Sequence, residues 1–435
     1  MKSKNQTDRR NFIAKTTTAA VAIIPGLGFI HKKNLGLPII PPTSENETNN
    51  GKPTAFPQPC LPLSWQKHGI AIEPDQPWEQ GFIQNFNSPA EPNGDGTWRL
   101  WYGVNPNLPL LPNIAVAIGV PGKKMEKYQA VLSEGEPEDA FLSIGNLPVG
   151  WRPVQPIHIK LKDGRHRLYF WAHANKQRIV RLLAAESNDG KRYRVIDPNR
   201  PCMYHFNDRA VEFQGVTKTG LKLNGKSEDV KKRYPRPSNE PAANPDLICN
   251  DGSSIYQLND GSFEMFVISL VSLEKGDPSW ATNDNLAGYI RVIDRLISKD
   301  GLNWYGRQTV VKPDFALDAV DQQFYYLNIT HTPKGRVGML GHFRSKDQTM
   351  DIEWCFSKDG INWVRPFRNR SWIERGWPGE PDCYAIYPGV SMVFDQGKWW
   401  TFYTGKNVIH NRKQFYGDPR SVIMFAETKS LWLNS

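Results

Sequence analysis

The feature that most constrains the fold of this 435-residue chain is a hairpin signal that occurs five times. In each copy, a polar turn ending in glycine is followed by a short stretch in which aromatic residues alternate with other residues. The copies are GDGTWRLWYGV around Gly96, KDGRHRLYFWA around Gly164, NDGSFEMFVIS around Gly261, PKGRVGMLGHF around Gly335 and DQGKWWTFYTG around Gly397. Glycine tolerates the positive φ of a tight turn, and alternating side chains face opposite sides of a strand. The repeat therefore predicts five β-hairpins.

Each hairpin is followed by a further stretch with a strand pattern. These third strands are expected at 113–120, 180–187, 288–298, 351–357 and 421–428. Three of them run into a second motif, which reads SNDGKRY at 187–193, SKDGLNW at 298–304 and SKDGINW at 357–363. Serine and aspartate cap such a turn by accepting hydrogen bonds from backbone amides, and the closing aromatic residue packs the outer strand onto the sheet. A turn that recurs at the same place in several units indicates a structural repeat.

Five such units, each a meander of about four short strands, predict an all-β fold, a five-bladed β-propeller. A β-sandwich also uses alternating strands, but it has no reason to repeat one turn five times. The 35 glycines, 34 prolines and numerous aromatic residues suit many short strands and turns. With 39% hydrophobic and 23% charged residues, the composition excludes a disordered tail. No apolar run is long enough to span a membrane as a helix.

The N-terminal segment has the layout of an export signal. Residues 1–34 carry seven lysines and arginines against a single acid, Asp8, and their apolar stretch runs from Thr16 to Phe29. Residues 35–61, rich in proline, asparagine and threonine, are interpreted as a linker, and 62–435 as the propeller. An insertion without a strand pattern is expected at about 200–245. Without the first 34 residues, the net charge falls from +10 to about +4, so nucleic acid is not an expected partner. A mildly basic cleft for an acidic polymer stays open.

Arg9 and Arg10, followed by Asn11, Phe12, Ile13 and Lys15, resemble a twin-arginine signal. The resemblance implies that the protein folds in the cytoplasm and is then exported, already folded, to the periplasm.

The candidate catalytic residues are acids that precede the hairpin glycines. In a propeller, the first strand of each blade lines the central axis, so the starts of these strands meet at one mouth. Glu79 precedes Gly96, Asp246 precedes Gly261, Asp321 precedes Gly335, and both Glu380 and Asp382 precede Gly397, all by 14 to 17 positions. Blade two offers Trp151 and Arg152 instead. Four of the five blades are therefore expected to send a carboxylate toward one mouth.

Clustered carboxylates suit glycoside hydrolysis, which needs a protonated acid on one side of the sugar and an ionised carboxylate on the other. Trp78, Trp151 and Tyr384 would supply aromatic faces, and Arg152 and Asp382 hydrogen bonds, to a sugar. His205 could reach the mouth from the insertion, although an ordinary loop position is the better explanation. Acids at strand starts also often only cap loops or pair with arginine, so each position has this second interpretation.

The five hairpins, the S-x-D-G-x-N-W turns and the axial acids resemble the five-bladed propeller glycoside hydrolases, such as families 43, 32 and 117, over residues 62–432. This resemblance implies an enzyme that cleaves oligosaccharides from plant or algal polysaccharide by paired-carboxylate catalysis. It implies Glu380 as the acid, Asp246 as helper or base and Asp321 as either, whereas Glu79 stands where those families carry an aspartate.

Two alternatives stay open: a carbohydrate-binding propeller without catalysis, and a sialidase-like hydrolase, since S-K-D-G-x-N-W is similar to the Asp-box. No cofactor is expected. The nine histidines lack zinc-ligand spacing, and nothing indicates a structural calcium ion, although the sequence leaves one open.

Overall fold

The computed structural model describes residues 65–432 apart from 80, 85–88, 105–113, 132–141, 175–178, 206–207, 209–212, 218–219, 224–252, 412–413 and 416. The described residues all belong to one compact unit, 56–435. The predicted signal segment and linker, and Asp246, lie outside the described residues.

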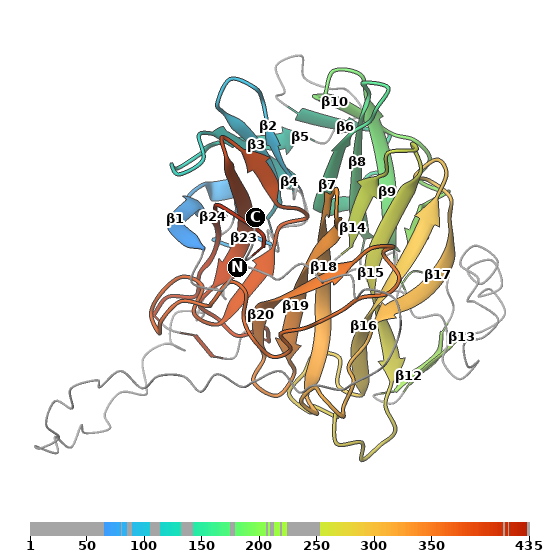
Figure 1. Ribbon diagram of the computed structural model, residues 1–435. Coiled ribbons are helices and arrows are strands. Elements are labelled where there is room, and N and C mark those ends of the chain that lie inside the picture. The colour runs from blue at the N-terminus through green and yellow to red at the C-terminus, as the bar shows by residue number, and fades with distance from the viewer. Residues whose placement is uncertain are drawn as a thin grey trace, which may run out of the picture. The chain divides into compact units, whose positions relative to one another are not determined.

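Within this unit the strands form five antiparallel blades (Figure 1). Blade one contains β2 (Ala90–Pro92), β3 (Trp98–Gly103), β4 (Ile114–Gly119) and β5 (Glu126–Val131). Blade two contains β7 (Arg152–Lys160), β8 (His166–Ala174), β9 (Ile179–Ser187) and β10 (Arg192–Val195), with β11 (Met203–Tyr204) paired to β9. Blade three contains β14 (Ser254–Gln257), β15 (Phe263–Ser272), β16 (Tyr289–Ser298) and β17 (Trp304–Val311). Blade four contains β18 (Gln322–Thr332), β19 (Gly335–Arg344) and β20 (Thr349–Ser357). Blade five contains β21 (Ala385–Pro388), β22 (Val393–Asp395), β23 (Lys398–Lys406), β24 (Ser421–Thr428) and β1 (Gln66–Ile72).

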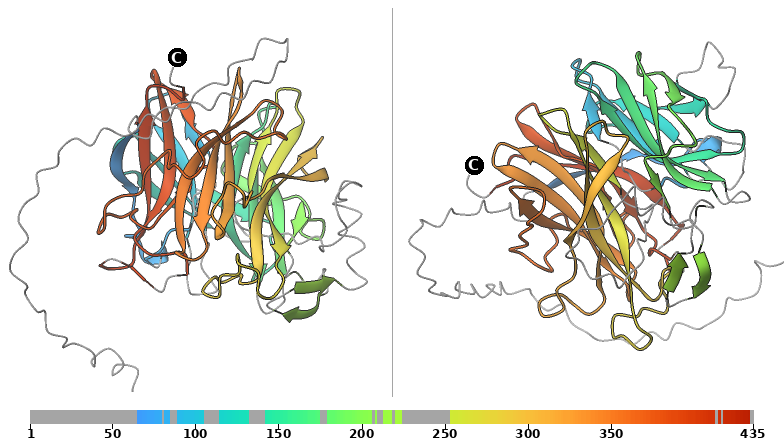
Figure 2. Two further views of the ribbon diagram at one scale, coloured as in Figure 1. Left: turned by 60° about the horizontal axis from the view of Figure 1, so that its bottom comes forward. Right: turned by 90° about the vertical axis from the view of Figure 1, so that its right-hand side faces the viewer.

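Three smaller elements complete the described fold. Strand β6 (Leu142–Gly145) runs parallel to both β5 and β10 and so joins the outer edges of blades one and two. The 3-10 turn η2 (Pro77–Glu79) precedes blade one. Strands β12 (Phe213–Thr217) and β13 (Gly220–Leu223) form a two-stranded ladder that stands apart from the blades in both views of Figure 2. This ladder and β11 lie in the predicted insertion, where the sequence pattern indicated no strand. Among the described residues, no helix is long and apolar enough to cross a membrane.

The five-bladed propeller predicted from the hairpin repeat is confirmed. All five hairpin glycines have positive φ, from 76° at Gly397 to 136° at Gly335. The second motif also has its expected geometry: the amide of Gly301 donates to Ser298 Oγ over 2.8 Å, and Asp300 Oδ1 accepts from two further amides. Trp304, which closes this turn, is only 2% exposed. These local interactions explain why the same sequence signal ends a strand in successive blades.

The ring closes through the first strand of the unit. Strand β1 pairs with β24, so the N-terminal strand forms the outer edge of the last blade. Side chains of blade five also donate to the segment that leads into blade one, from Thr404 Oγ1 to the Gln84 carbonyl and from Ser421 Oγ to the Ile83 carbonyl. Closure in this way leaves few unpaired strand edges.

The core consists of layers between neighbouring blades. Trp171 of β8 and Met265 of β15 share one buried cluster, and Trp101 of β3 and Phe170 of β8 share another. The inner strands are tied to each other across the blades: Asn328 donates to the Pro388 carbonyl, and Ser254 donates to the Leu327 carbonyl. Face-to-face packing thereby holds the inner strands in a ring around one axis.

Candidate functional site

The axis has two mouths, which we name by the inner strands. At the strand-start mouth, the inner strands β7, β14, β18 and β21 begin. At the hairpin mouth, the inner strands turn back into the second strand of their blade. The predicted acids all precede inner strands, so they belong to the strand-start mouth.

Glu79 ends the turn η2 and is completely buried. Its Oε1 accepts from the Tyr102 hydroxyl over 2.9 Å, and its Oε2 accepts from Lys127 Nζ over 2.7 Å and from the Gln76 amide over 2.8 Å. Burial raises the pKa of Tyr102, and the charge of Glu79 adds to the rise, so the Tyr102 hydroxyl stays protonated and donates a hydrogen bond to Glu79. Both oxygens of Glu79 are therefore occupied by groups of its own blade.

Asp321 lies immediately before β18 and is 3% exposed. Its Oδ1 accepts from Arg344 Nη2 over 2.6 Å, and its backbone carbonyl accepts from the Ser345 amide. Burial alone would raise the pKa of Asp321, but the hydrogen bonds and charge of Arg344 outweigh it, and the net shift is downward. Asp321 is therefore an ionised partner of Arg344.

Glu380 and Asp382 precede β21. Their carboxylates lie close together, since both pack against Gly376: a Cβ at that position would collide with Glu380 Oε2 and with Asp382 Oδ1. They differ in exposure. Asp382 is buried, and its Oδ2 accepts from Lys67 Nζ over 2.7 Å and from the Tyr403 hydroxyl over 3.2 Å. Glu380 is exposed and accepts from the Trp377 amide over 2.8 Å. Of the predicted catalytic acids that the structure describes, Glu380 is the one in contact with solvent.

The other predicted residues take varied positions. Trp78 packs beside Tyr102, with ring centroids 6.5 Å apart. The Tyr384 hydroxyl accepts from Gln414 Nε2 over 2.8 Å. Trp151 begins blade two, with the Arg181 guanidinium 5.3 Å from its ring, and Arg152 is the cross-strand neighbour of His173.

His205 is buried against the edge of Trp171, and this burial lowers its pKa to about 3. His205 is therefore a neutral, packed side chain rather than a charged group at the mouth.

A cluster at the strand-start mouth links the predicted acids of three blades. His410 lies after β23, with Nδ1 2.9 Å from the Tyr387 hydroxyl and Nε2 3.3 Å from the Tyr325 hydroxyl. Its amide donates to the carbonyl of Gln348, which lies beside Asp321 and Arg344. Lys406 Nζ lies 4.4 Å from the Tyr387 ring and 5.1 Å from the ring of Phe82, whose amide donates to the Glu79 carbonyl. Backbone and ring contacts thus connect the segments that carry the acids of blades one, four and five.

Tyr325, Tyr387, Lys406 and His410 were not among the predicted site residues, because most of those were chosen by their position before the hairpin glycines. For Tyr325 and Tyr387, side-chain alternation along the inner strands β18 and β21 was a usable signal, because it identifies the residues that lie on one face of a strand.

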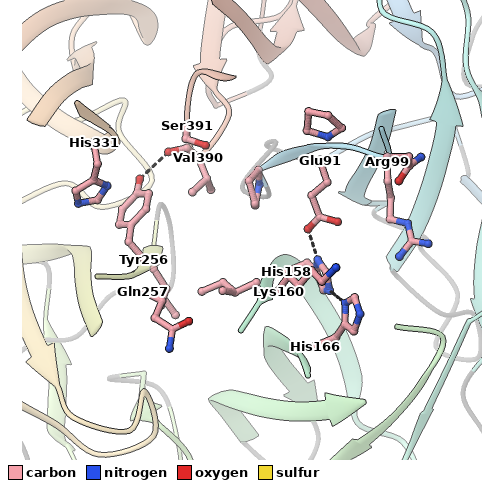
Figure 3. A pocket seen from close by; sticks show the side chains of 15 residues that line it. Glu91, Arg99, His158, Lys160, His166, Tyr256, Gln257, His331, Val390 and Ser391 are labelled. Atoms are coloured by element: carbon pink, nitrogen blue, oxygen red, sulfur yellow. Dashed lines mark hydrogen bonds and ion pairs between the residues drawn. The ribbon is translucent and has the colours of Figure 1, made fainter. Parts of the chain in front are cut away.

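The structure also has a cavity of about 430 Å³ at the hairpin mouth (Figure 3). Its walls come from the ends of the inner strands and include Glu91, His158, Lys160, Tyr256, His331 and Ser391. All five blades therefore contribute to it. Of the predicted site residues that the structure describes, none lines this cavity. Among the described residues, no group of three or more histidine, cysteine, aspartate or glutamate side chains is placed to hold a metal ion.

Solved structures with a similar course of chain include a putative glycosidase from Bacteroides thetaiotaomicron, at 12% identity over 83% of this chain and 96% of that one, with a TM-score of 0.48. An N-acetylgalactosamine deacetylase from F. plautii, solved with blood group B trisaccharide, is 16% identical over 86% and 94%, with a TM-score of 0.48. A family 117 glycoside hydrolase produced by Zobellia galactanivorans is 14% identical over 87% and 92%, with a TM-score of 0.44. No protein-family model and no curated protein sequence matches the chain. At this level of likeness, a function has to come from the chain's own site residues.

Proposed function

We propose that the protein is a glycoside hydrolase that binds an oligosaccharide at the strand-start mouth. The observation that carries this proposal is the exposed Glu380 beside buried, cation-paired Asp382, in a segment before the inner strand β21. His410 at the same mouth is half-buried, in contact with the buried Tyr325 and Tyr387, and gives the mouth a hydrogen-bonding group that suits a sugar hydroxyl.

In this proposal Glu380 protonates the leaving oxygen, because it is the described acid that a substrate can reach. Asp246 is the proposed base or nucleophile on the other side of the sugar. Glu79 is paired with Lys127, and Asp321 is paired with Arg344. We assign to these two carboxylates the role of fixing the mouth, and no direct contact with the scissile bond. The proposed substrates are oligosaccharides of plant or algal polysaccharide, acidic ones included, and the proposed compartment is the periplasm.

The test compares wild-type protein with Glu380→Gln and Asp246→Asn on aryl glycosides and on plant and algal oligosaccharides. Loss of a general acid lowers turnover by about 10²–10⁴-fold. A dinitrophenyl leaving group departs without a proton, so Glu380→Gln should regain most of its activity on dinitrophenyl glycosides. Glu126→Gln, an exposed glutamate on the outer strand β5, is the matched control. Undiminished turnover of unactivated substrates by Glu380→Gln would refute the assignment.

A carbohydrate-binding propeller without catalysis is the second candidate, and the ion pairs of Glu79 and Asp321 favour it, since neither carboxylate has both oxygens available. Saturable oligosaccharide binding without turnover, weakened by His410→Ala, would support this candidate over the hydrolase.

A further inference from the structure

The cavity at the hairpin mouth is separate from the strand-start mouth. Its lining residues stand at the ends of the inner strands, whereas the predicted acids stand before their starts. Figure 3 shows Glu91, His158 and Lys160 on one side of the space and Tyr256 and His331 on the other. A volume of about 430 Å³ falls in the range of small-molecule sites. The cavity therefore has the size for a ligand of its own.

The walls of this cavity carry two basic side chains that no acid of the described residues pairs. Within the described part of the chain, neither Arg99 nor Lys160 has an ion-pair partner, and Arg99 Nε is buried without a hydrogen bond. The nearby carboxylates have other partners. Glu91 contacts His158 Nδ1, and Glu264 is surrounded by Arg295, Arg336 and His331. Two cations without an ion-pair partner among the described residues favour a ligand that brings negative charge.

A chain of three side chains extends into the same wall. His158 is completely buried between Glu91, which contacts its Nδ1, and His166, whose Nδ1 lies 3.2 Å from its Nε2. The Trp101 ring stacks on His158 at 4.9 Å and holds it in place. Burial lowers the pKa of His166 and the charge of His158 lowers it further, while Glu91 opposes this and Lys160 and Arg99 make smaller contributions in the lowering direction. Arg99 and Lys160 thus both lie near His166, and an anion beside them would offset their positive charge.

The opposite wall is rigid. The Tyr256 hydroxyl donates to the Val390 carbonyl over 2.6 Å and accepts from the Ile329 amide over 2.6 Å, so it joins blades three, four and five. A wall fixed in this way loses little conformational entropy when a ligand binds.

We propose that the hairpin-mouth cavity is a binding site for a sugar-sized organic oxyanion, a molecule with a carboxylate or a sulfate or phosphate group that Arg99 and Lys160 pair. This proposal does not depend on the proposed hydrolase activity, because it uses a different mouth and different residues.

The test is isothermal titration calorimetry of the full chain with D-galacturonate as the carboxylate probe, inorganic sulfate as the tetrahedral probe and D-galactose as the uncharged control. We expect saturable binding of at least one anion and none of galactose. Lys160→Met and Arg99→Gln should each weaken the anion's affinity about tenfold or more, the loss expected when a charged group loses a charged partner. Lys160 is exposed, so its substitution leaves the core intact.

Two control variants test whether anion binding is specific to this cavity. Lys299→Met removes an equal charge from an exposed turn outside the cavity, and Glu380→Gln alters the other mouth. Both should leave the affinity for the anion unchanged. The proposal is overturned if neither anion binds, if galactose binds as well as galacturonate, if Lys160→Met binds like wild type, or if Glu380→Gln rather than Lys160→Met abolishes binding.

Discussion

Replacement of Glu264 by glutamine should make the protein less stable by an amount that depends on pH. Glu264 lies in β15 with its side chain completely buried, and its carboxylate faces Arg295 of β16 and both His331 of β18 and Arg336 of β19. Burial alone would raise its pKa, but hydrogen bonds from His331 and Arg336 and their charges outweigh this, and the pKa falls from 4.5 to about 2. Glu264 therefore ties blade three to blade four as an ionised group.

The size and sign of the effect follow from this pKa. A folded-state pKa lowered by about 2.5 units corresponds to about 3 kcal/mol of stability, which is complete well above the unfolded pKa. As the pH falls through 4.5 toward 2, the folded protein keeps the carboxylate ionised while the unfolded chain protonates it, so this stability is lost. We expect Glu264→Gln to cost about 3 kcal/mol near neutral pH and about half as much near pH 3.

The assay is urea unfolding followed by tryptophan fluorescence at a series of pH values, with the difference between wild type and variant plotted against pH. Glu274→Gln, an exposed glutamate in the loop after β15, serves as the control and should differ from wild type by less than about 0.5 kcal/mol at every pH. A difference for Glu264→Gln that stays constant with pH, or grows as the pH falls, would refute the reasoning.

Three further outcomes are expected. Glu79→Gln should lower the free energy of unfolding, measured with urea, by about 2–3 kcal/mol, because the Lys127 side chain is only 5% exposed and loses a buried partner. Adding Lys127→Met should recover most of this loss. Simple additivity of the two losses would contradict the ion pair. Gly261→Ala should cost about 1–2 kcal/mol of stability from its φ of 90° alone. Gly301→Ala should cost more, because the new Cβ would also collide with Arg167 and the Tyr169 hydroxyl. Equal losses of melting temperature in the two variants would argue against this packing. Replacement of both Arg9 and Arg10 by lysine should keep the protein in the cytoplasm by cell fractionation, and unchanged periplasmic levels would exclude the twin-arginine route.

The blades could be predicted because their signals are local. The positive φ at Gly164 or Gly397 is a property of the turn itself, and the Ser298–Asp300–Gly301 turn is closed by hydrogen bonds between residues two or three positions apart. Alternation of side chains then decides which face of each strand is buried. Five such units in sequence leave few arrangements that cover every blade, and a ring is the one found.

The environment of each acid was decided by contacts far along the chain. Lys67, which pairs with Asp382, precedes it by 315 positions, and Lys127 follows Glu79 by 48. No pattern around Glu79 or Asp321 distinguishes a buried carboxylate with a cation beside it from an exposed one such as Glu380. The same holds for the hairpin-mouth cavity, where Glu91 and His158 stand 67 positions apart in different blades.

By itself, then, the sequence determined the repeated strands, their turns and the number of blades, since these follow from glycine conformations and from side-chain alternation within about ten residues. Only the closed ring decided which of the described acids have a cation beside them, which one meets solvent and where two cations without a described ion-pair partner line a cavity. Ion pairing and burial depend on side chains that folding alone brings together, and their partners leave no mark on the local sequence.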